Sequence, residues 1–204
     1  TVQVVLTSAQ EEEQTNLQIF SLKDTSSLSF ARHATAVVKT APNPPTASAL
    51  TAIQIALLPY PVAVSDYYQT LQKQGLNYGK SFRVIQQLWQ LNGQALSQIR
   101  CPDDIVNETY HLHPALLDGC FQTIGAAVRA DASKGTYLTI GLDQLDFYQP
   151  LQHSGWCHIQ LHANNSSNNG EILENKALNQ TIKADLSLWN NDGVLSAHIT
   201  GMTL

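Results

Sequence analysis

Charged residues are scarce in this sequence, and none of them gather into a basic stretch. Only 13% of the residues are charged and the formal net charge is −5, whereas a protein that binds nucleic acid usually presents a basic face. The sequence also lacks a run of about 18 apolar residues, the length that a membrane-spanning helix requires, and it lacks the pattern of a signal peptide. We therefore expect that neither nucleic acid nor a membrane is a partner of this protein.

Cysteine is rare as well. The three residues, Cys101, Cys120 and Cys157, are odd in number and widely spaced, and no pair has the C-x-x-C spacing of a zinc site. His158 and His162 share one face of a predicted strand, but the sequence offers no third ligand near them. We expect buried free thiols, a reducing cytoplasmic compartment and no metal site.

Apolar residues, by contrast, make up 43% of the 204 residues, which is enough for a packed core. Residues 1–40 predict an antiparallel meander of three strands. These strands are expected at residues 1–7, 17–22 and 29–39. Residues 41–63 begin with a proline-rich stretch and predict an extended linker, which leads to a second unit at residues 64–204. Because the sequence enters a strand directly after Thr1, we expect it to be a piece of a longer chain.

Residues 64–204 predict one long helix among antiparallel strands. The helix is expected to run from Pro114, since proline suits the first helical position, to about residue 130. Its apolar residues recur every three or four positions and predict a buried stripe: Leu117, Phe121, Ile124 and Val128. Gly119 costs helix stability, and we expect it to allow a close approach of the helix backbone to a sheet or a ligand. A curved sheet that wraps one central helix is an α+β hotdog fold, and we predict this fold.

The other elements of this unit follow from turn and capping signals. Ser65 is expected to cap a shorter helix and Gly75 to end it. A hairpin is expected over residues 82–100 around the turn Asn92-Gly93. Further strands are expected at residues 136–140, 142–148, 155–163, 183–189 and 194–204.

Asp118 and Gln122 are the strongest candidates for chemistry. Their spacing of four places both side chains on one face of the predicted helix. The helix dipole favours an ionised Asp118, whereas partial burial favours the neutral acid. A carboxyl in this balance can donate a proton to a leaving hydroxyl, and Gln122 can hold it through a hydrogen bond. The alternative is an ordinary carboxylate near a helix N-terminus beside a glutamine that faces solvent.

The surrounding residues allow more than one interpretation. Tyr78 is expected either to point its hydroxyl into the same cleft or to pack in a loop, and Gly79 beside it to adopt an unusual backbone angle. Phe82 is expected in the core. His113, which directly precedes Pro114, is expected to cap or orient the start of the helix.

Four stretches of the sequence, in this order, resemble dehydratase domains of modular polyketide synthases. Arg32-His33-Ala34 is similar to a strand near the end of the family's first hotdog. Residues 78–82 resemble the YGxxF motif, and residues 113–122 resemble HPALLD with its DxxxQ/H pair. Residues 137–140 stand where the family often has an LPV-like motif. The resemblance covers essentially the whole chain, and the combination of YGxxF with HPALLD is specific.

The resemblance implies a double hotdog, with residues 1–40 as the last strands of its first half and residues 64–204 as its second half. Such domains remove water from a β-hydroxyacyl thioester carried on the phosphopantetheine arm of an acyl carrier protein, without a further cofactor. The expected partners are this carrier protein, the other domains of the synthase and, in the intact domain, a second copy. The resemblance implies catalytic roles for Asp118, Gln122 and Tyr78. It implies substrate contacts for Gly79, Phe82, His113, Leu138 and Thr139.

The family's catalytic histidine has no counterpart in this sequence. It belongs to an HxxxGxxxxP motif and takes the α-proton, but none of the seven histidines is followed by glycine at the fourth position. We expect this motif to precede Thr1 in the parent chain and these residues alone to be inactive. Because part of a hotdog would expose apolar strand edges, we expect either self-association or a missing or disordered upstream segment.

Two further departures leave alternatives open. Thr139 and Lys80 stand where the family usually or often has proline. One alternative is an enoyl isomerase or a cyclising enzyme on the same fold. The other is a degenerate, non-catalytic domain that serves as a structural or docking module.

Overall fold

The chain forms two compact units, Thr1–Pro42 and Asn43–Leu204, in a computed structural model. The structure describes residues 2–8, 14–24, 29–40, 43, 50–105, 109–128, 137–151, 153–162 and 181–204. The first unit is an antiparallel meander of β1 (Val2–Ser8), β2 (Gln14–Asp24) and β3 (Ser29–Lys39). The three predicted strands and their order are confirmed, although β2 is longer than expected.

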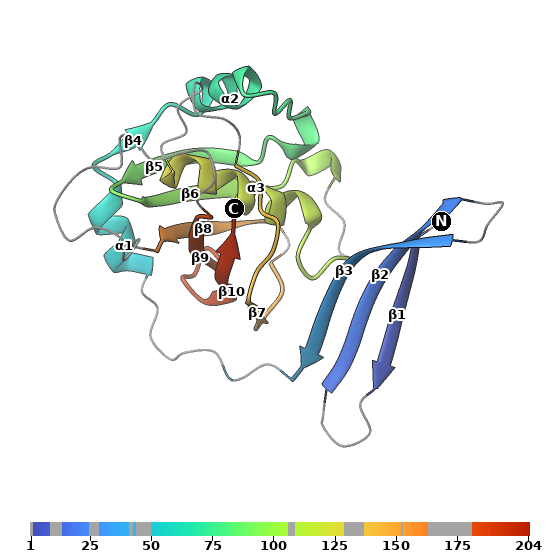
Figure 1. Cartoon of the computed structure of the whole chain (residues 1–204). Helices are drawn as coiled ribbons and strands as arrows, with labels where there is room; N and C mark the ends of the chain where they lie inside the picture. Colours follow the sequence, from blue (N-terminus) through green and yellow to red (C-terminus); the bar gives the residue numbers. More distant parts are fainter. Residues whose placement is uncertain are drawn as a thin grey trace, which may run out of the picture. The chain divides into compact units, whose positions relative to one another are not determined.

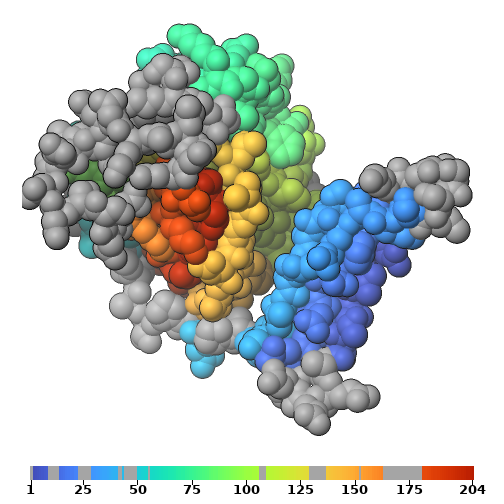
Figure 2. Space-filling model, in the orientation of Figure 1, coloured from blue at the N-terminus to red at the C-terminus, as the bar shows by residue number. Residues whose placement is uncertain are grey.

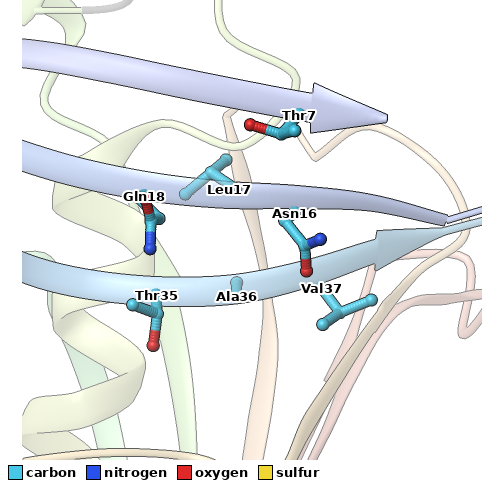
Figure 3. Close-up of a pocket in the computed structure, with 7 residues that line it drawn as sticks. All are labelled: Thr7, Asn16, Leu17, Gln18, Thr35, Ala36 and Val37. Carbon is cyan, nitrogen blue, oxygen red and sulfur yellow. The ribbon is translucent and has the colours of Figure 1, made fainter. Parts of the chain in front are cut away.

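One face of this meander is apolar and exposed. Leu6 pairs with Leu17, and Leu17 pairs with Ala36, so these side chains share a face with the alternate residues of β1. Val2, Val4 and Leu6 expose 71%, 56% and 63% of their surface. A shallow hollow on the meander contains none of the predicted site residues; Figure 3 shows its lining residues Thr7, Asn16, Leu17, Gln18, Thr35, Ala36 and Val37.

The second unit is built on a seven-stranded antiparallel sheet with the order β4-β5-β6-β8-β9-β10-β7. Its strands are β4 (Pro61–Val62), β5 (Ile85–Leu91), β6 (Gln94–Arg100), β7 (Gln144–Phe147), β8 (Ser154–Leu161), β9 (Lys183–Trp189) and β10 (Leu195–Thr203). Asn92 and Gly93 join β5 to β6 with φ angles of 46° and 77°. Both lie in the left-handed region that the commonest tight hairpin turn requires, and the predicted hairpin is confirmed.

Helix α3 (Pro114–Ala127) packs on one face of this sheet, as Figure 1 shows. The predicted buried stripe is confirmed in part: Ile124 is buried, whereas Leu117, Phe121 and Val128 are half-buried but pack against the core. The most deeply buried positions of the helix are mainly small residues instead: Ala115, Gly119, Cys120, Thr123, Ala126 and Ala127. The reason is the expected close approach at Gly119, where an added Cβ would lie 2.2 Å from Val84 Cγ2.

The stretch predicted as a linker, residues 41–63, contains two elements among its described residues. These are β4 and helix α1 (Leu50–Leu57). Leu50 and Leu57 are buried against Trp89, Leu96 and Trp189. Side chains alternate along β6, and α1 packs on Leu96 whereas α3 packs on the neighbouring Ala95, so the two helices lie on opposite faces of the sheet. Apolar packing therefore orders a segment that local sequence signals predict as extended.

Helix α2 (Val64–Lys73) begins earlier than predicted and ends as predicted. Ala63 is its N-cap and makes no side-chain cap, whereas Ser65 donates to Asp66 within the helix, so the predicted Ser65 cap is wrong. Gly75 has a φ of 89°. The backbone N–H of Leu76 donates to the Leu71 carbonyl over 2.9 Å, as in a helix end closed by a left-handed glycine.

The stretch before β7 is less regular than expected. Its described residues 137–140 form no strand, and only Ile140 is tied to β10, through its backbone N–H to the Thr203 carbonyl at 2.9 Å. In Figure 2 the gold-coloured residues around 137–147 lie on the surface beside the red β10. Leu138 and Ile140 expose 58% and 79% of their surface.

Cys101, Cys120 and Cys157 are buried and free, which confirms the predicted buried thiols. Burial raises the pKa of the Cys157 thiol well above its usual value. Within the described parts of the chain, no helix is long and apolar enough to cross a membrane. Among the same residues, no three acidic, histidine or cysteine side chains are grouped so that they can hold a metal ion.

Because β8 carries a buried histidine, we expect the free energy of unfolding to fall in mild acid. His158 is 8% exposed and its Nε2 lies 3.0 Å from Gln94 Oε1, and desolvation lowers its pKa from 6.5 to about 4. Between these values the unfolded chain binds more protons than the folded chain, so stability falls as the pH falls through this window. We expect a loss of about 2 kcal/mol at about pH 5 from this group alone.

The measurement is urea unfolding at about pH 7.5 and about pH 5 for the wild type, His158→Gln and His153→Gln. The exposed His153 serves as the control. His158→Gln should lose less stability on acidification than the other two proteins. Equal losses in all three would show that His158 does not cause the dependence.

Candidate functional site

The start of α3 fixes the position of Asp118. His113 is the N-cap residue, and its Nδ1 accepts a hydrogen bond from the backbone N–H of Ala115 over 3.1 Å. Pro114 occupies the first helical turn, and the Tyr110 ring meets the His113 ring edge-on at 5.2 Å. The predicted capping role of His113 is thus confirmed. Its contact with a substrate stays a prediction.

Gln122 is buried and holds Asp118 directly. It is 4% exposed, so the alternative of a glutamine that faces solvent is wrong. Its Nε2 donates to Asp118 Oδ2 over 2.7 Å. Asp118 itself is half-buried. The spacing of four residues therefore produces the paired arrangement that the sequence predicts.

The rest of the Gln122 amide is also occupied. Nε2 donates a second hydrogen bond to the Phe82 carbonyl over 2.8 Å. Oε1 accepts from the Tyr68 hydroxyl over 3.0 Å, and the backbone carbonyl of Gln122 accepts from the Tyr67 hydroxyl. The amide is therefore held on three sides by α2, by α3 and by the short 3-10 turn η1 (Lys80–Phe82).

Tyr78 lies at the edge of the same group. Its half-buried ring packs edge-on against Tyr68, with 6.3 Å between the ring centroids. Burial and, to a smaller extent, the negative charge of Asp118 raise the pKa of the Tyr78 hydroxyl, which keeps its proton. Arg83 donates from Nε to the Tyr78 carbonyl over 3.0 Å, and its guanidinium lies 5.3 Å from the centre of the Tyr68 ring. The loop that carries Tyr78 is thereby tied to α2.

Two expectations for the neighbouring residues are wrong. Gly79 has an ordinary extended backbone, with φ of −73° and ψ of 170°, and a Cβ added there would meet no heavy atom within 4 Å. Phe82 is 43% exposed rather than part of the core. It is the turn η1 that brings its backbone carbonyl, and not its ring, to Gln122.

The structure does not bring every predicted site residue together. Asp118, Gln122, Tyr78 and the backbone of Phe82 form one group. Among the described contacts, none joins Leu138 or Thr139 to Asp118, and Leu138 is 58% exposed. Their substrate contacts stay predictions.

Tyr68 is the residue of this group that sequence reasoning missed. Helical spacing places it on the packing face of α2, and it is 7% exposed. The same spacing gives no sign that its hydroxyl ends at Gln122, which is 54 residues away in the chain. The available signal is the pair of tyrosine hydroxyls, Tyr67 and Tyr68, on a buried helix face.

Comparison with known proteins places almost the whole second unit in one family model. Residues 46–204 match the model described as the polyketide synthase dehydratase N-terminal domain. Among curated proteins, the chain is 29% identical over 138 residues to one protein of the phenolphthiocerol/phthiocerol polyketide synthase of Mycobacterium tuberculosis, covering 65% of this chain and 8% of that protein. It is 25% identical over 150 residues to the polyketide synthase PksM of Bacillus subtilis, covering 70% and 3%.

Solved structures agree. The dehydratase domain from the CurJ module of curacin polyketide synthase is 31% identical with a TM-score of 0.78, and the match covers 99% of this chain and 66% of that one. The CurK dehydratase domain is 28% identical with a TM-score of 0.77, covering 99% and 65%. Two CurK mutants are described as inactive, one with aspartate changed to asparagine and one with histidine changed to phenylalanine. These neighbours are hotdog dehydratase domains, and the predicted α+β hotdog fold is confirmed.

Proposed function

The chain belongs to the polyketide synthase dehydratase family, and from this membership we propose that it takes part in the dehydration of a β-hydroxyacyl thioester to an α,β-unsaturated thioester. One observation carries the proposal: the half-buried Asp118 accepts a 2.7 Å hydrogen bond from a buried glutamine amide. The chain spans 8% of the length of the mycobacterial synthase. The reaction and the partners of the whole protein are therefore part of the proposal.

In the proposed reaction, Asp118 is the acid. A base takes a proton from the carbon next to the thioester carbonyl, and the electron pair of that C–H bond forms the new C=C bond. The C–O bond to the β-hydroxyl breaks, and Asp118 gives its proton to the departing oxygen, which leaves as water.

The base is assigned to a histidine outside this sequence, because the sequence contains no HxxxGxxxxP motif. The CurK dehydratase supports the need for both groups, since a histidine mutant and an aspartate mutant of that enzyme are both inactive. We therefore expect no turnover from these 204 residues alone.

Tyr78 and its neighbours are assigned to substrate binding. The Tyr78 hydroxyl keeps its proton and can donate a hydrogen bond to the substrate, and the open space at Gly79 admits a chain beside the backbone. Phe82, His113, Leu138 and Thr139 complete the proposed contacts. Lys80 and Arg83 are exposed near this loop and suit the phosphate of a phosphopantetheine arm. The proposal includes an acyl carrier protein as partner, the other domains of a synthase, a second copy in the intact domain and a cytoplasmic location, with no further cofactor.

The test is turnover of a β-hydroxyacyl thioester, loaded on a carrier protein, by the full-length protein as its gene encodes it. Mass spectrometry of the carrier-bound acyl chain should show the loss of one water, and NMR of the released product should show an α,β double bond. A product of unchanged mass with a shifted double bond, formed from an unsaturated substrate only, would identify an isomerase instead. A ring in the product would identify a cyclising enzyme, and no conversion of any substrate would support a non-catalytic domain.

A further inference from the structure

The Gln122 amide connects Asp118 to a second tyrosine that no substrate needs to touch. We propose that Tyr68 is a positioning residue for Asp118, that it acts through the side-chain amide of Gln122, and that this relay keeps the transferable proton on Oδ1 of Asp118. The inference rests on the proposed function. In this relay, Tyr68 holds the orientation of the Gln122 amide, and the amide determines which oxygen of Asp118 accepts a hydrogen bond.

The Phe82 carbonyl decides which way the amide faces. A backbone carbonyl can only accept hydrogen bonds, and the Gln122 amide atom next to it lies at 2.8 Å. That atom must be the nitrogen, because an amide oxygen there would place two acceptors against each other. The assignment of Nε2 and Oε1 therefore follows from hydrogen-bond chemistry.

The second hydrogen of Nε2 then decides which oxygen of Asp118 carries the proton when the carboxyl is neutral. It points to Oδ2 over 2.7 Å, and an amide nitrogen has no lone pair with which to accept a proton in return. Oδ2 is thus an acceptor whether the carboxyl is charged or neutral. The proton of the neutral acid is left to Oδ1, which makes no hydrogen bond to any of the described residues.

Tyr68 closes the relay from the other side. Oε1 of Gln122 accepts from the Tyr68 hydroxyl over 3.0 Å, and that hydroxyl oxygen accepts from the backbone N–H of Ile85 over 3.3 Å. Burial raises the pKa of Tyr68 to about 12, so the donor proton is retained. With all three of its positions bonded, the amide cannot rotate without breaking hydrogen bonds inside the protein, where unpaired polar groups are costly.

Tyr67 provides a matched comparison within the same helix. It is also 7% exposed, and its hydroxyl donates to the same residue. Its acceptor is the backbone carbonyl of Gln122, so it fixes the helix and not the amide. Removing either hydroxyl deletes one buried hydrogen bond to Gln122, but only the Tyr68 change frees the group that touches Asp118.

The kinetic test compares Tyr68→Phe with Tyr67→Phe in the full-length protein. For Tyr68→Phe we expect kcat for dehydration to fall about tenfold, which corresponds to the free-energy contribution of one hydrogen bond. KM should stay unchanged within about twofold. For Tyr67→Phe we expect a lower unfolding midpoint and a kcat within about twofold of the wild type. An active enzyme whose kcat is the same in both variants would overturn the proposal.

The spectroscopic test does not depend on activity. In the wild type, the two Nε2 protons of Gln122 should give slowly exchanging side-chain amide signals, identified by their loss in Gln122→Met. These signals should move and exchange faster in Tyr68→Phe and keep their positions in Tyr67→Phe. This pattern in a protein that dehydrates nothing would support the relay and reject the proposed function. Signals unchanged by Tyr68→Phe would overturn the relay, whatever the activity.

Discussion

Replacing Asp118 by asparagine is expected to lower kcat for dehydration by about 10²–10⁴-fold, the contribution of a positioned acid. Asparagine has the same shape, and its side-chain oxygen can still accept the hydrogen bond from Gln122 Nε2. The amide cannot release a proton to a departing hydroxyl near neutral pH. The change thus removes the proposed chemistry and keeps the local structure. It is measured as kcat of the full-length protein beside its thermal unfolding midpoint, which should stay within about 2 °C of the wild type.

Asp103→Asn is the matched control for this change. Asp103 forms a 2.9 Å ion pair with Arg100, and its side chain is 84% exposed. An exposed ion pair contributes little to stability, so both kcat and the midpoint should be unchanged. An Asp118→Asn protein that dehydrates at the wild-type rate would remove Asp118 from the mechanism.

The largest expected effect on stability comes from Gly155 in β8. A Cβ at this position would lie 2.3 Å from the backbone oxygen of Trp189 and 3.0 Å and 3.1 Å from the two terminal carbons of Leu151. The nearest atom belongs to the neighbouring strand β9, so no side-chain rotation relieves the overlap. We expect Gly155→Ala to lower the free energy of unfolding by about 3 kcal/mol, the upper end of overpacking effects. Urea unfolding monitored by tryptophan fluorescence measures it.

Gly79→Ala is the control for Gly155→Ala. Gly79 has an ordinary backbone conformation and open space around it, so alanine should leave stability unchanged or raise it by about 0.4–1 kcal/mol through the unfolded chain. If Gly155→Ala unfolds at the wild-type urea concentration, the strands around it adjust more easily than this packing implies.

Turn, cap and helix-spacing signals in the sequence correctly predict features that depend on residues close together in the chain. The turn at Asn92-Gly93 is set by two residues that tolerate positive φ, and the pairing of Asp118 with Gln122 is set by the pitch of a helix. The cap at His113 follows from the proline after it. In each case the interacting groups lie within a few residues of one another, so local sequence is enough to predict that they meet.

Predictions fail where distant parts of the chain decide the outcome. Helix α1 forms in a stretch that begins with prolines, because tryptophans of β5 and β9 cover its apolar residues. The buried side of α3 follows from Val84, which admits no side chain at Gly119. The role of Tyr68 depends on a bond across 54 residues. No periodicity within one element contains these partners.

The contact between Gly119 and Val84 also determines the position of Asp118. Successive residues of a helix are rotated by about 100°, and Asp118 directly precedes the glycine whose backbone presses on Val84. A helix held at this one bare position cannot roll or slide without forcing a larger side chain against the valine. The packing of Gly119 against Val84 thus fixes the angular position of Asp118, the proposed proton donor, on the helix. A larger side chain at position 119 should therefore disturb both the packing of Val84 and the placement of Asp118.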